Sequence, residues 1–311
     1  MIPAIHTIAA IEAALLADDG ARFRQLQGKV LPHIGDAYSG KRDDGKRSHM
    51  GASAIGKNCA RAIWYEFRWA GEKERDPEHY QRMIRLWNRG HLEEGRFIAL
   101  LMMINCRVIQ QDKTGKQLRF KDAHGHYAGS MDGVVFDCPD SVDGKPGLVE
   151  FKTYNEKRFK DLVSNGVRYS DETYYVQVQQ YMQRFRLTWC LFLAVCKNDE
   201  TLHAEIVLFD KANAEQYKDR ALQLVFMDTP PMKLPRASPG RFPCNAFCDY
   251  MPVCLLGAEP DVSCRTCQFS EPIAKEGDDG KGLWYCRHDA RELDRDAQVA
   301  ACGNYRKMDC L

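Results

Sequence analysis

The chain has 311 residues, a formal net charge of +1 and 13 cysteines. The balanced charge excludes nucleic-acid binding through an overall positive field, so any such binding has to come from local basic patches. The longest apolar run, Trp189–Cys196, is too short to cross a bilayer, and the first residues lack the basic start and apolar stretch of a signal peptide. We therefore expect a cytoplasmic protein without membrane contact, in which thiols stay reduced and clustered cysteines bind metal.

The first hundred residues are predicted to be mostly helical. An apolar stripe indicates a helix over residues 4–26, and further helices are expected from Ser53 to about Trp69 and over residues 78–104. The polar stretch 40–47 is either a solvated linker or an arm that contacts DNA. Basic side chains in this part could follow phosphates: Lys41, Arg42, Lys46, Arg47, Lys57 and Arg61. Aromatic side chains could stack on unpaired bases or pack between helices: Trp64, Tyr65 and Trp69.

Strands dominate the middle of the chain. Helices are predicted at 171–186 and 210–226, and strands at 106–111, 116–121, 127–137, 147–153, 189–196 and 202–209. A proline-rich stretch at 230–243 marks a boundary, and eight of the 13 cysteines lie in the 68 residues after it. Helices, then a strand meander, then alternating helices and strands predict an α/β fold with a mixed central sheet flanked by helices.

Two short apolar runs, Met131–Phe136 and Leu148–Lys152, are predicted to pair as a hairpin around the turn-rich stretch between them. Folding the hairpin at its midpoint sets Asp132 opposite Glu150. Because side chains alternate along a strand, Glu150 and Lys152 share one face. Two carboxylates held together on an apolar sheet are unfavourable unless a cation accompanies them, and Mg²⁺ or Mn²⁺ prefers such oxygen ligands. We therefore predict a divalent-metal site here, with an ordinary row of surface ions as the alternative.

Two helices carry further candidates. Glu94 follows Gly90 by one helical turn, so the two residues lie on the same side of the helix. The small residue Gly90 would allow close approach there, and the Glu94 carboxylate would point in the same direction. Glu94 could complete the metal shell or orient a metal-bound water, whereas Glu93 is expected to be solvated. On the helix after the hairpin, Gln177 and Tyr181 share a face and could hydrogen-bond the DNA backbone or hold the nearby lysine in place. A polar helix face with a core tyrosine is the alternative.

In chain order, these residues form four short motifs: Gly90-x3-Glu94, Gly129-x2-Asp132, Glu150-x-Lys152 and Gln177-x3-Tyr181. The set resembles the PD-(D/E)XK nuclease superfamily, and more closely its RecB-like and phage-exonuclease branch, over about residues 50–210. The resemblance implies a restriction-endonuclease-like core. In it, Asp132, Glu150 and the backbone carbonyl of Phe151 would bind the divalent metal, while Lys152 assists the attacking water. Many RecB-like members have a histidine at the position of Glu94, and an acid there is similar to the phage lambda-exonuclease pattern.

The cysteines fall into two groups. The first resembles the iron–sulfur subgroup of the same branch, which includes CRISPR-associated RecB-like exonucleases and the AddB nuclease domain. The resemblance implies that four thiolates hold a structural [4Fe–4S] cluster in a helical lobe: Cys59, Cys244, Cys248 and Cys254. The second group begins with a Cys-x2-Cys knuckle and predicts a small module held by Zn²⁺ or a second cluster: Cys264, Cys267, Cys286 and Cys302. The isolated cysteines are expected to pack in the core: Cys106, Cys138, Cys190 and Cys196.

The sequence predicts an N-terminal helix and basic linker at 1–50, a RecB-like core closed by the iron–sulfur lobe at 51–255, and a metal-binding module at 256–311. We expect a metal-dependent DNA exonuclease that acts on DNA ends or single strands, as phage and DNA recombination or repair enzymes do. A recombination or processing protein could be its partner. The alternatives are a non-catalytic DNA-binding or adaptor protein that kept the fold, and a site-specific or structure-specific endonuclease of the same superfamily.

Overall fold

The computed structural model describes residues 1–40, 45–71, 77–274 and 280–311, which form two compact units. The first unit comprises residues 1–42, 76–120 and 130–214, and the second comprises residues 43–75, 121–129 and 215–311. Each unit is assembled from three separate segments, and not from contiguous domains with boundaries after residues 50 and 255 as predicted. No helix in the described ranges is both long and apolar enough to span a membrane.

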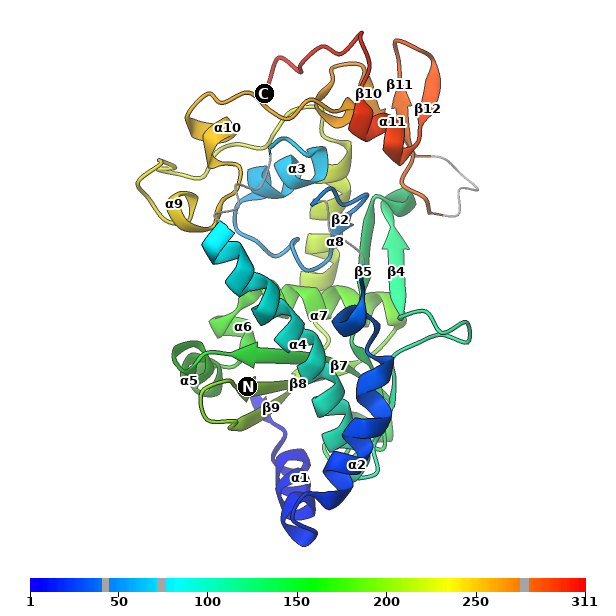
Figure 1. Ribbon diagram of the computed structural model, residues 1–311, viewed down its shortest axis with the longest axis vertical. Coiled ribbons are helices and arrows are strands. Elements are labelled where there is room, and N and C mark those ends of the chain that lie inside the picture. Colours follow the sequence, from blue (N-terminus) through cyan, green and yellow to red (C-terminus); the bar gives the residue numbers. More distant parts are fainter. Residues whose placement is uncertain (41–44, 72–76, 275–279) are drawn as a thin grey trace. The chain divides into compact units, whose positions relative to one another are not determined.

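A six-stranded mixed sheet forms the centre of the first unit (Figure 1). Its order is β1 (Ile2–Pro3), β9 (Leu202–Leu208), β8 (Trp189–Cys196), β7 (Gly147–Tyr154), β6 (Gly133–Phe136) and β3 (Arg107–Ile109). Strands β7 and β8 pair in parallel, and the other neighbours are antiparallel. All of β8 and most of β7 are buried, as expected for apolar strands in a sheet covered on both faces.

Helices cover both faces of this sheet, which confirms the predicted α/β architecture. One face carries α1 (Ile5–Ala17), α2 (Ala21–Val30) and α4 (Pro77–Met103). The other carries α5 (Glu156–Asn165), α6 (Val167–Ser170) and α7 (Glu172–Phe185). The single helix predicted over residues 4–26 is divided into α1 and α2, because the chain turns at Asp18–Gly20, where Gly20 has a φ of 72°.

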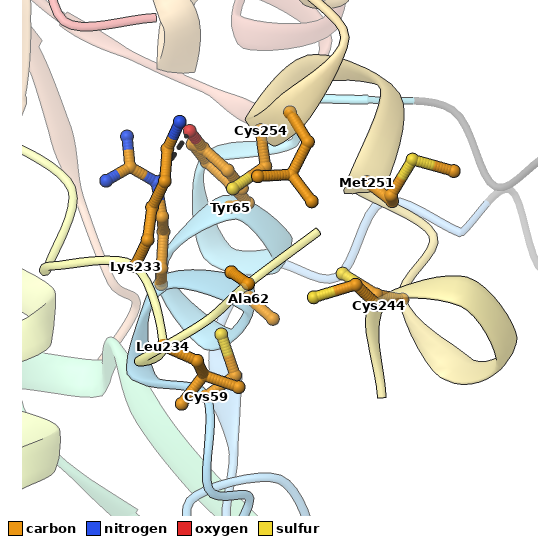
Figure 2. Close-up of a pocket in the computed structure, with 12 residues that line it drawn as sticks. Cys59, Ala62, Tyr65, Lys233, Leu234, Cys244, Met251 and Cys254 are labelled. Atoms are coloured by element: carbon orange, nitrogen blue, oxygen red, sulfur yellow. Dashed lines mark hydrogen bonds between the residues drawn. The ribbon is translucent and has the colours of Figure 1, made fainter. Parts of the chain in front are cut away.

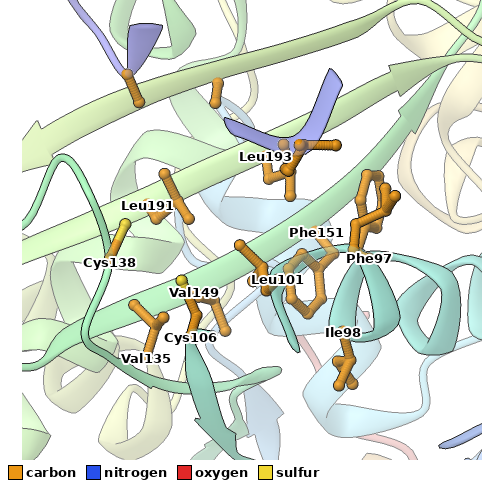
Figure 3. Packing of buried hydrophobic residues seen from close by; sticks show 14 of the residues in the cluster. Phe97, Ile98, Leu101, Cys106, Val135, Cys138, Val149, Phe151, Leu191 and Leu193 are labelled. Atoms are coloured by element: carbon orange, nitrogen blue, oxygen red, sulfur yellow. The ribbon is translucent and has the colours of Figure 1, made fainter. Parts of the chain in front are cut away.

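One apolar core lies between α4 and the sheet (Figure 3). The rings of Phe97 and Phe151 stack there at 5.1 Å with 15° between their planes. Each buried side chain of this size contributes about 1.5–3 kcal/mol to stability. Strand alternation places Val149 and Phe151 in this core, so Glu150 and Lys152 point to the opposite face of the sheet, toward α7.

The second unit contains two small sheets and several short helices. One sheet has the order β2 (Met50–Gly51), β5 (Tyr127–Ser130) and β4 (Arg119–Asp122), and the other has β10 (Ser270–Pro272), β11 (Trp284–Cys286) and β12 (Arg291–Leu293). Its helices are α3 (Ala60–Arg68), most of α8 (Lys211–Phe226), α9 (Cys244–Phe247), α10 (Met251–Leu255) and α11 (Arg295–Ala300). The helix predicted from Ser53 to Trp69 is therefore shorter, since residues 52–56 form turns and Trp69 has a φ of 53°.

A buried arginine anchors the C-terminal segment inside the second unit. Arg265 donates to the backbone carbonyls of Phe67 at 2.7 Å and Ser48 at 2.9 Å. Its guanidinium lies 3.8 Å from the centre of the Trp69 ring, and burial lowers its pKa well below the usual range. Segment 256–311, expected as a separate module, thus shares its core with α3.

The aromatic side chains considered for base stacking are buried. Trp64, Tyr65 and Trp69 are 0%, 2% and 3% exposed. The indole nitrogen of Trp64 donates to the carbonyl of Met227 at 3.0 Å, and that of Trp69 donates to the carbonyl of Arg47 at 2.8 Å. Of the two roles considered for these side chains, base stacking is therefore wrong, and packing within the fold is confirmed. Of the basic residues considered for phosphate contact, Lys41 and Arg42 lie outside the described residues.

Candidate active site

The candidate site lies in the first unit, where β5 ends and β6 begins. The register pairs Gly133 with Val149, so Asp132 stands opposite Glu150 directly beyond the last pair. This confirms the register predicted for the hairpin. Asp132 lies outside the ladder, and its Oδ2 accepts the N–H of Phe151 at 2.8 Å. The two carboxylates therefore meet at positions that the sheet backbone sets.

Glu150 is the most buried member of the site, with 1% of its side chain exposed. Its Oε1 accepts from Nζ of Lys152 at 2.5 Å, while its Oε2 is buried and has no hydrogen-bond partner in the described part of the chain. An unsatisfied buried oxygen costs about 1–3 kcal/mol, and more when it is charged. A bound cation would satisfy such an oxygen.

The acids and Lys152 influence one another's ionisation. Burial raises the pKa of Asp132, and the Glu150 and Glu94 carboxylates raise it further. Burial also raises the pKa of Glu150, although Lys152 opposes the shift. For Lys152 burial acts downward, but the Glu150 and Asp132 carboxylates outweigh it, and the pKa is raised. The ammonium also lies 4.3 Å from the centre of the Tyr174 ring.

Glu94 approaches this pair from α4. It raises the pKa of both Asp132 and Glu150 through its charge, and its Oε1 lies 3.5 Å from Nδ1 of His91. Its side chain is 23% exposed. Among the described residues, no group of three His, Cys, Asp or Glu side chains is placed to hold a metal ion.

Gly90 and Glu93 have different surroundings on α4, and the expectation for Glu93 is wrong. At Gly90, no other segment or side chain of the described chain comes within 4 Å of where a Cβ would lie, so this glycine does not serve close packing within the protein. Glu93, expected to be solvated, is 5% exposed, and its Oε2 accepts from Nη1 of Arg96 at 3.0 Å. The helix turns Glu93 inward and leaves an open surface at Gly90, one turn before Glu94.

Helix α7 places Gln177 and Tyr181 on one face, as their spacing predicts. Nε2 of Gln177 donates to the Tyr181 hydroxyl at 3.1 Å. Oε1 of Gln177 is buried without a partner among the described residues. Burial raises the pKa of Tyr181, and the Glu150 and Asp132 carboxylates contribute to the shift. The two side chains thus border the acid pair and add a second unsatisfied oxygen.

Sequence reasoning missed Tyr174, whose ring faces the Lys152 ammonium. Tyr174 precedes Gln177 by three residues and Tyr181 by seven on α7. That spacing puts all three on one side of the helix. It was the available indication that Tyr174 belongs with them.

The first cysteine group lines one hollow within the second unit (Figure 2). Cys59 precedes α3, Cys244 and Cys248 lie at the two ends of α9, and Cys254 lies in α10. Figure 2 shows the sulfurs of Cys59, Cys244 and Cys254 directed toward a common space. The hollow encloses about 320 Å³, part of it open to solvent. The structure thus gathers four thiols without placing any three at the distances that one metal ion requires within the described chain.

The second cysteine group lies around the β10–β12 sheet. Cys264, Cys267 and Cys286 are buried, and Cys302 is exposed. The amide of Asp289 donates to Sγ of Cys286 at 3.5 Å. Burial, followed by the neighbouring thiols of this group, raises the pKa of Cys264 to about 11. The cysteines predicted to pack in the core are buried: Cys106, Cys138, Cys190 and Cys196.

No family model and no curated protein matches this sequence. Among solved structures, the fold is similar to LHK-Exo in complex with dAMP, at 18% identity and a TM-score of 0.38, over 57% of this chain and 86% of that chain. A second structure of LHK-Exo, an alkaline exonuclease from Laribacter hongkongensis, is 17% identical with a TM-score of 0.38. That match covers 58% of this chain and 87% of the other chain. The structure of SSO0001 is 14% identical with a TM-score of 0.35, and the match covers 74% of this chain and 94% of that chain.

Proposed function

We propose that the chain is a metal-dependent DNA nuclease that hydrolyses phosphodiester bonds, and that it acts as an exonuclease on DNA ends or single strands. One observation carries the proposal. Asp132 stands opposite Glu150, one Glu150 oxygen is bound to Lys152, and the other is buried without a partner in the described chain. Crowded carboxylates beside an ammonium suit a divalent cation and a phosphate. A row of solvated surface ions, the alternative considered above, does not agree with the burial of Glu150.

Asp132 and Glu150 would hold Mg²⁺ or Mn²⁺ together with the backbone carbonyl of Phe151. Glu94 would bind the ion or one of its waters. All these donors are oxygens, which hard cations prefer, and the unsatisfied oxygens of Glu150 and Gln177 support the fit. When bound, the ion would lower the pKa of a coordinated water and neutralise charge on the scissile phosphate.

The chain's own residues would position the reactants. Lys152 carries its positive charge beside the acids, where it would orient the attacking water or bind a phosphate oxygen. Glu150 at 2.5 Å and the Tyr174 ring at 4.3 Å position its ammonium. Gln177 and Tyr181 would hydrogen-bond the DNA backbone beside it. Because one strand and one helix supply these groups, their alignment exists before substrate binds.

For the first cysteine group we infer a structural [4Fe–4S] cluster. The four thiols line one hollow of the second unit, which supports the inference. The four thiolates would bind the irons of such a cluster, which takes four cysteine ligands. Arg61 and Lys233, which also line the hollow, would offset the negative charge of the thiolates.

For the second cysteine group we propose Zn²⁺, with a second iron–sulfur cluster as the alternative. Cys264 and Cys267 lie at the two ends of one tight turn, as in a metal knuckle. The amide of Asp289 would stabilise Cys286 as a thiolate, which is the form that binds metal. The ion would brace the end of the chain.

A nuclease assay with Mg²⁺ or Mn²⁺ tests the central proposal. End-labelled linear DNA and single-stranded DNA should be digested, and closed circles should be spared. Cleavage of circles would instead assign an endonuclease. A wild-type protein that binds DNA in a gel shift but cleaves none of these substrates would be a non-catalytic DNA-binding protein.

The Lys152→Ala variant tests the site itself. It should lose cleavage and keep DNA binding, since it removes one ammonium and leaves both carboxylates. Lys160→Ala is the matched control, because Lys160 also binds a glutamate at 2.5 Å but lies on the exposed side of α5. Full activity of Lys152→Ala would remove this residue from the mechanism.

A further inference from the structure

The first half of α4 is an exposed helix. No residue from 77 to 90 is buried, whereas burial begins at Glu93. In Figure 1 this half (cyan) extends past the strands of the first unit. At 1.5 Å per residue its length is about 20 Å. Most of its residues are exposed, and the others are partly exposed, along several helical turns.

One face of this half is aromatic and leads to the candidate site. With about 100° between successive helical residues, Tyr80, Met83, Trp87 and Gly90 fall within about 40° of the line through Glu94. The rings of Tyr80 and Trp87 contact each other at 5.9 Å with 72° between their planes. We call this row of residues the α4 stripe. It ends at Gly90, one turn before Glu94.

Trp87 differs from every other tryptophan in the chain. It is 50% exposed, whereas the other four are at most 3% exposed: Trp64, Trp69, Trp189 and Trp284. Tryptophan is enriched at the centres of binding surfaces. Trp87 is not a single exposed apolar residue, since Tyr80 contacts it on the same face of α4.

Gly90 adds an independent observation. A glycine in the middle of a helix is destabilising relative to alanine, and it serves where a backbone or ligand approaches closely. No part of the described chain approaches it within 4 Å. A ligand that passes from Trp87 to Glu94 would cross this open position.

The exposed half carries an excess of positive charge, which attracts a polyanion at long range and not through contacts within the α4 stripe. Residues 77–92 contain three arginines and a single acid, Glu78. Arg89 pairs with Glu200 at 3.3 Å. Arg82 and Arg85 lie on the side of the helix away from the α4 stripe and make no ion pair among the described residues.

We propose that the α4 stripe receives a single DNA strand on its way to the candidate active site, with Tyr80 and Trp87 stacking on unpaired bases and Gly90 leaving room for the strand beside Glu94. Every base has a flat face, so stacking of this kind tolerates any sequence. Bases in a duplex already stack on one another, and the stripe therefore selects unpaired DNA. The inference rests on the proposed nuclease function and adds the strand that the enzyme accepts.

Binding without cleavage tests the inference. The Lys152→Ala protein, without divalent metal, is titrated into a fluorescein-labelled oligothymidylate, and the fluorescence anisotropy of the label gives Kd. In a second titration, an unlabelled oligothymidylate is added to the same protein and the tryptophan emission is measured. Because Trp87 is the exposed tryptophan, its emission should be quenched by the single strand and not by a blunt duplex of equal length. Trp87→Ala should raise Kd by roughly 5- to 100-fold, the loss expected for one stacked base, and Tyr80→Ala should act in the same direction.

Leu86→Ala is the matched control. Leu86 is 39% exposed on the same helix but lies about 80° around it from Glu94. It should leave Kd unchanged. Unchanged affinity of Trp87→Ala, equal weakening by Leu86→Ala, or equal quenching by the blunt duplex would overturn the inference, and none of these results would alter the cleavage assay. A protein that binds single strands through Trp87 yet never cleaves would support the stripe and remove only the nuclease proposal.

Discussion

The acid pair of the first unit and the cysteine hollow of the second unit differ in what holds their side chains in place. Asp132, Glu150 and Lys152 lie on or beside paired strands. Phe151, between the last two, is held by Oδ2 of Asp132 and by stacking on Phe97. The pairing of the sheet and these contacts therefore set the three positions.

The hollow is built from much shorter elements. α9 has four residues and α10 has five, and helices of this length have little stability of their own. The thiols of Cys244, Cys248 and Cys254 are thus positioned by short segments with little stability of their own. Paired strands fix the first site within the sheet, whereas the second would gain stability if the proposed cluster bound there.

The largest expected effect comes from Asp132→Asn. Asparagine can still accept the N–H of Phe151, but it removes one of the two crowded charges. Cleavage should fall by about a thousandfold or more, and Mn²⁺ binding measured by calorimetry should be lost. The melting temperature of the metal-free protein should stay the same or rise, as expected for a site that is built for its ion and carries uncompensated charge.

Asp140→Asn is the control for this change. Oδ2 of Asp140 also accepts a backbone N–H, that of Thr7, at 2.6 Å. This hydrogen bond is made to the first turn of α1, away from the acid pair. This variant should keep both Mn²⁺ affinity and cleavage. Wild-type Mn²⁺ affinity in Asp132→Asn would contradict the metal assignment.

Cys248→Ser should have the next largest effect, and it falls on the second unit. Anaerobically purified wild-type protein should be brown and contain iron, and the variant should lose both the colour and at least about 4 kcal/mol of unfolding free energy. Cys310→Ser is the matched control, because Sγ of Cys310 contacts the carbonyl of Asp228 at 3.8 Å and does not line the hollow. A colourless wild-type preparation that contains zinc alone would contradict the cluster.

The Arg265→Met variant tests whether Arg265 stabilises part of the second unit independently of any metal. The substitution keeps the volume but leaves the carbonyls of Phe67 and Ser48 buried without a donor. Unfolding free energy from urea titration should fall by about 2–4 kcal/mol. Arg287→Met should change it by less than about 1 kcal/mol. Arg287 also donates to a backbone carbonyl, that of Gln268 at 2.7 Å, but this bond and its 3.6 Å ion pair with Glu271 are exposed to solvent. Equal effects of the two variants would show that Arg265 is not an anchor.

Local pattern was sufficient to predict the strands of the candidate site. The two apolar runs on either side of one turn-rich stretch have a single midpoint, so the register that sets Asp132 opposite Glu150 follows from the sequence. The i, i+4 spacing of Gln177 and Tyr181 likewise predicts a shared face, and their 3.1 Å hydrogen bond agrees with it.

Features that depend on distant segments were not predictable in this way. Glu93 and Glu94 are adjacent in sequence, and only the tertiary contacts of α4 make one buried and the other partly exposed. Trp69 is buried because Arg265, almost two hundred residues later, stacks on it. Periodicity gives the faces of a helix, but it does not reveal which face the rest of the chain covers.

The smallest expected effect separates the contribution of Gly90 to folding stability from its contribution to the access of DNA to the acid pair. Gly90→Ala and Gly28→Ala each place a methyl group on a helix where nothing lies within 4 Å, so each should raise unfolding free energy by about 0.5–1 kcal/mol. In Gly90→Ala, however, the methyl group stands beside the path to Glu94, and kcat/KM on single-stranded DNA should fall several-fold. Gly28→Ala on α2 should keep wild-type kcat/KM. If both variants gained stability with equal activity, Gly90 would be an ordinary surface glycine and the strand would have to reach Glu94 by another side of α4.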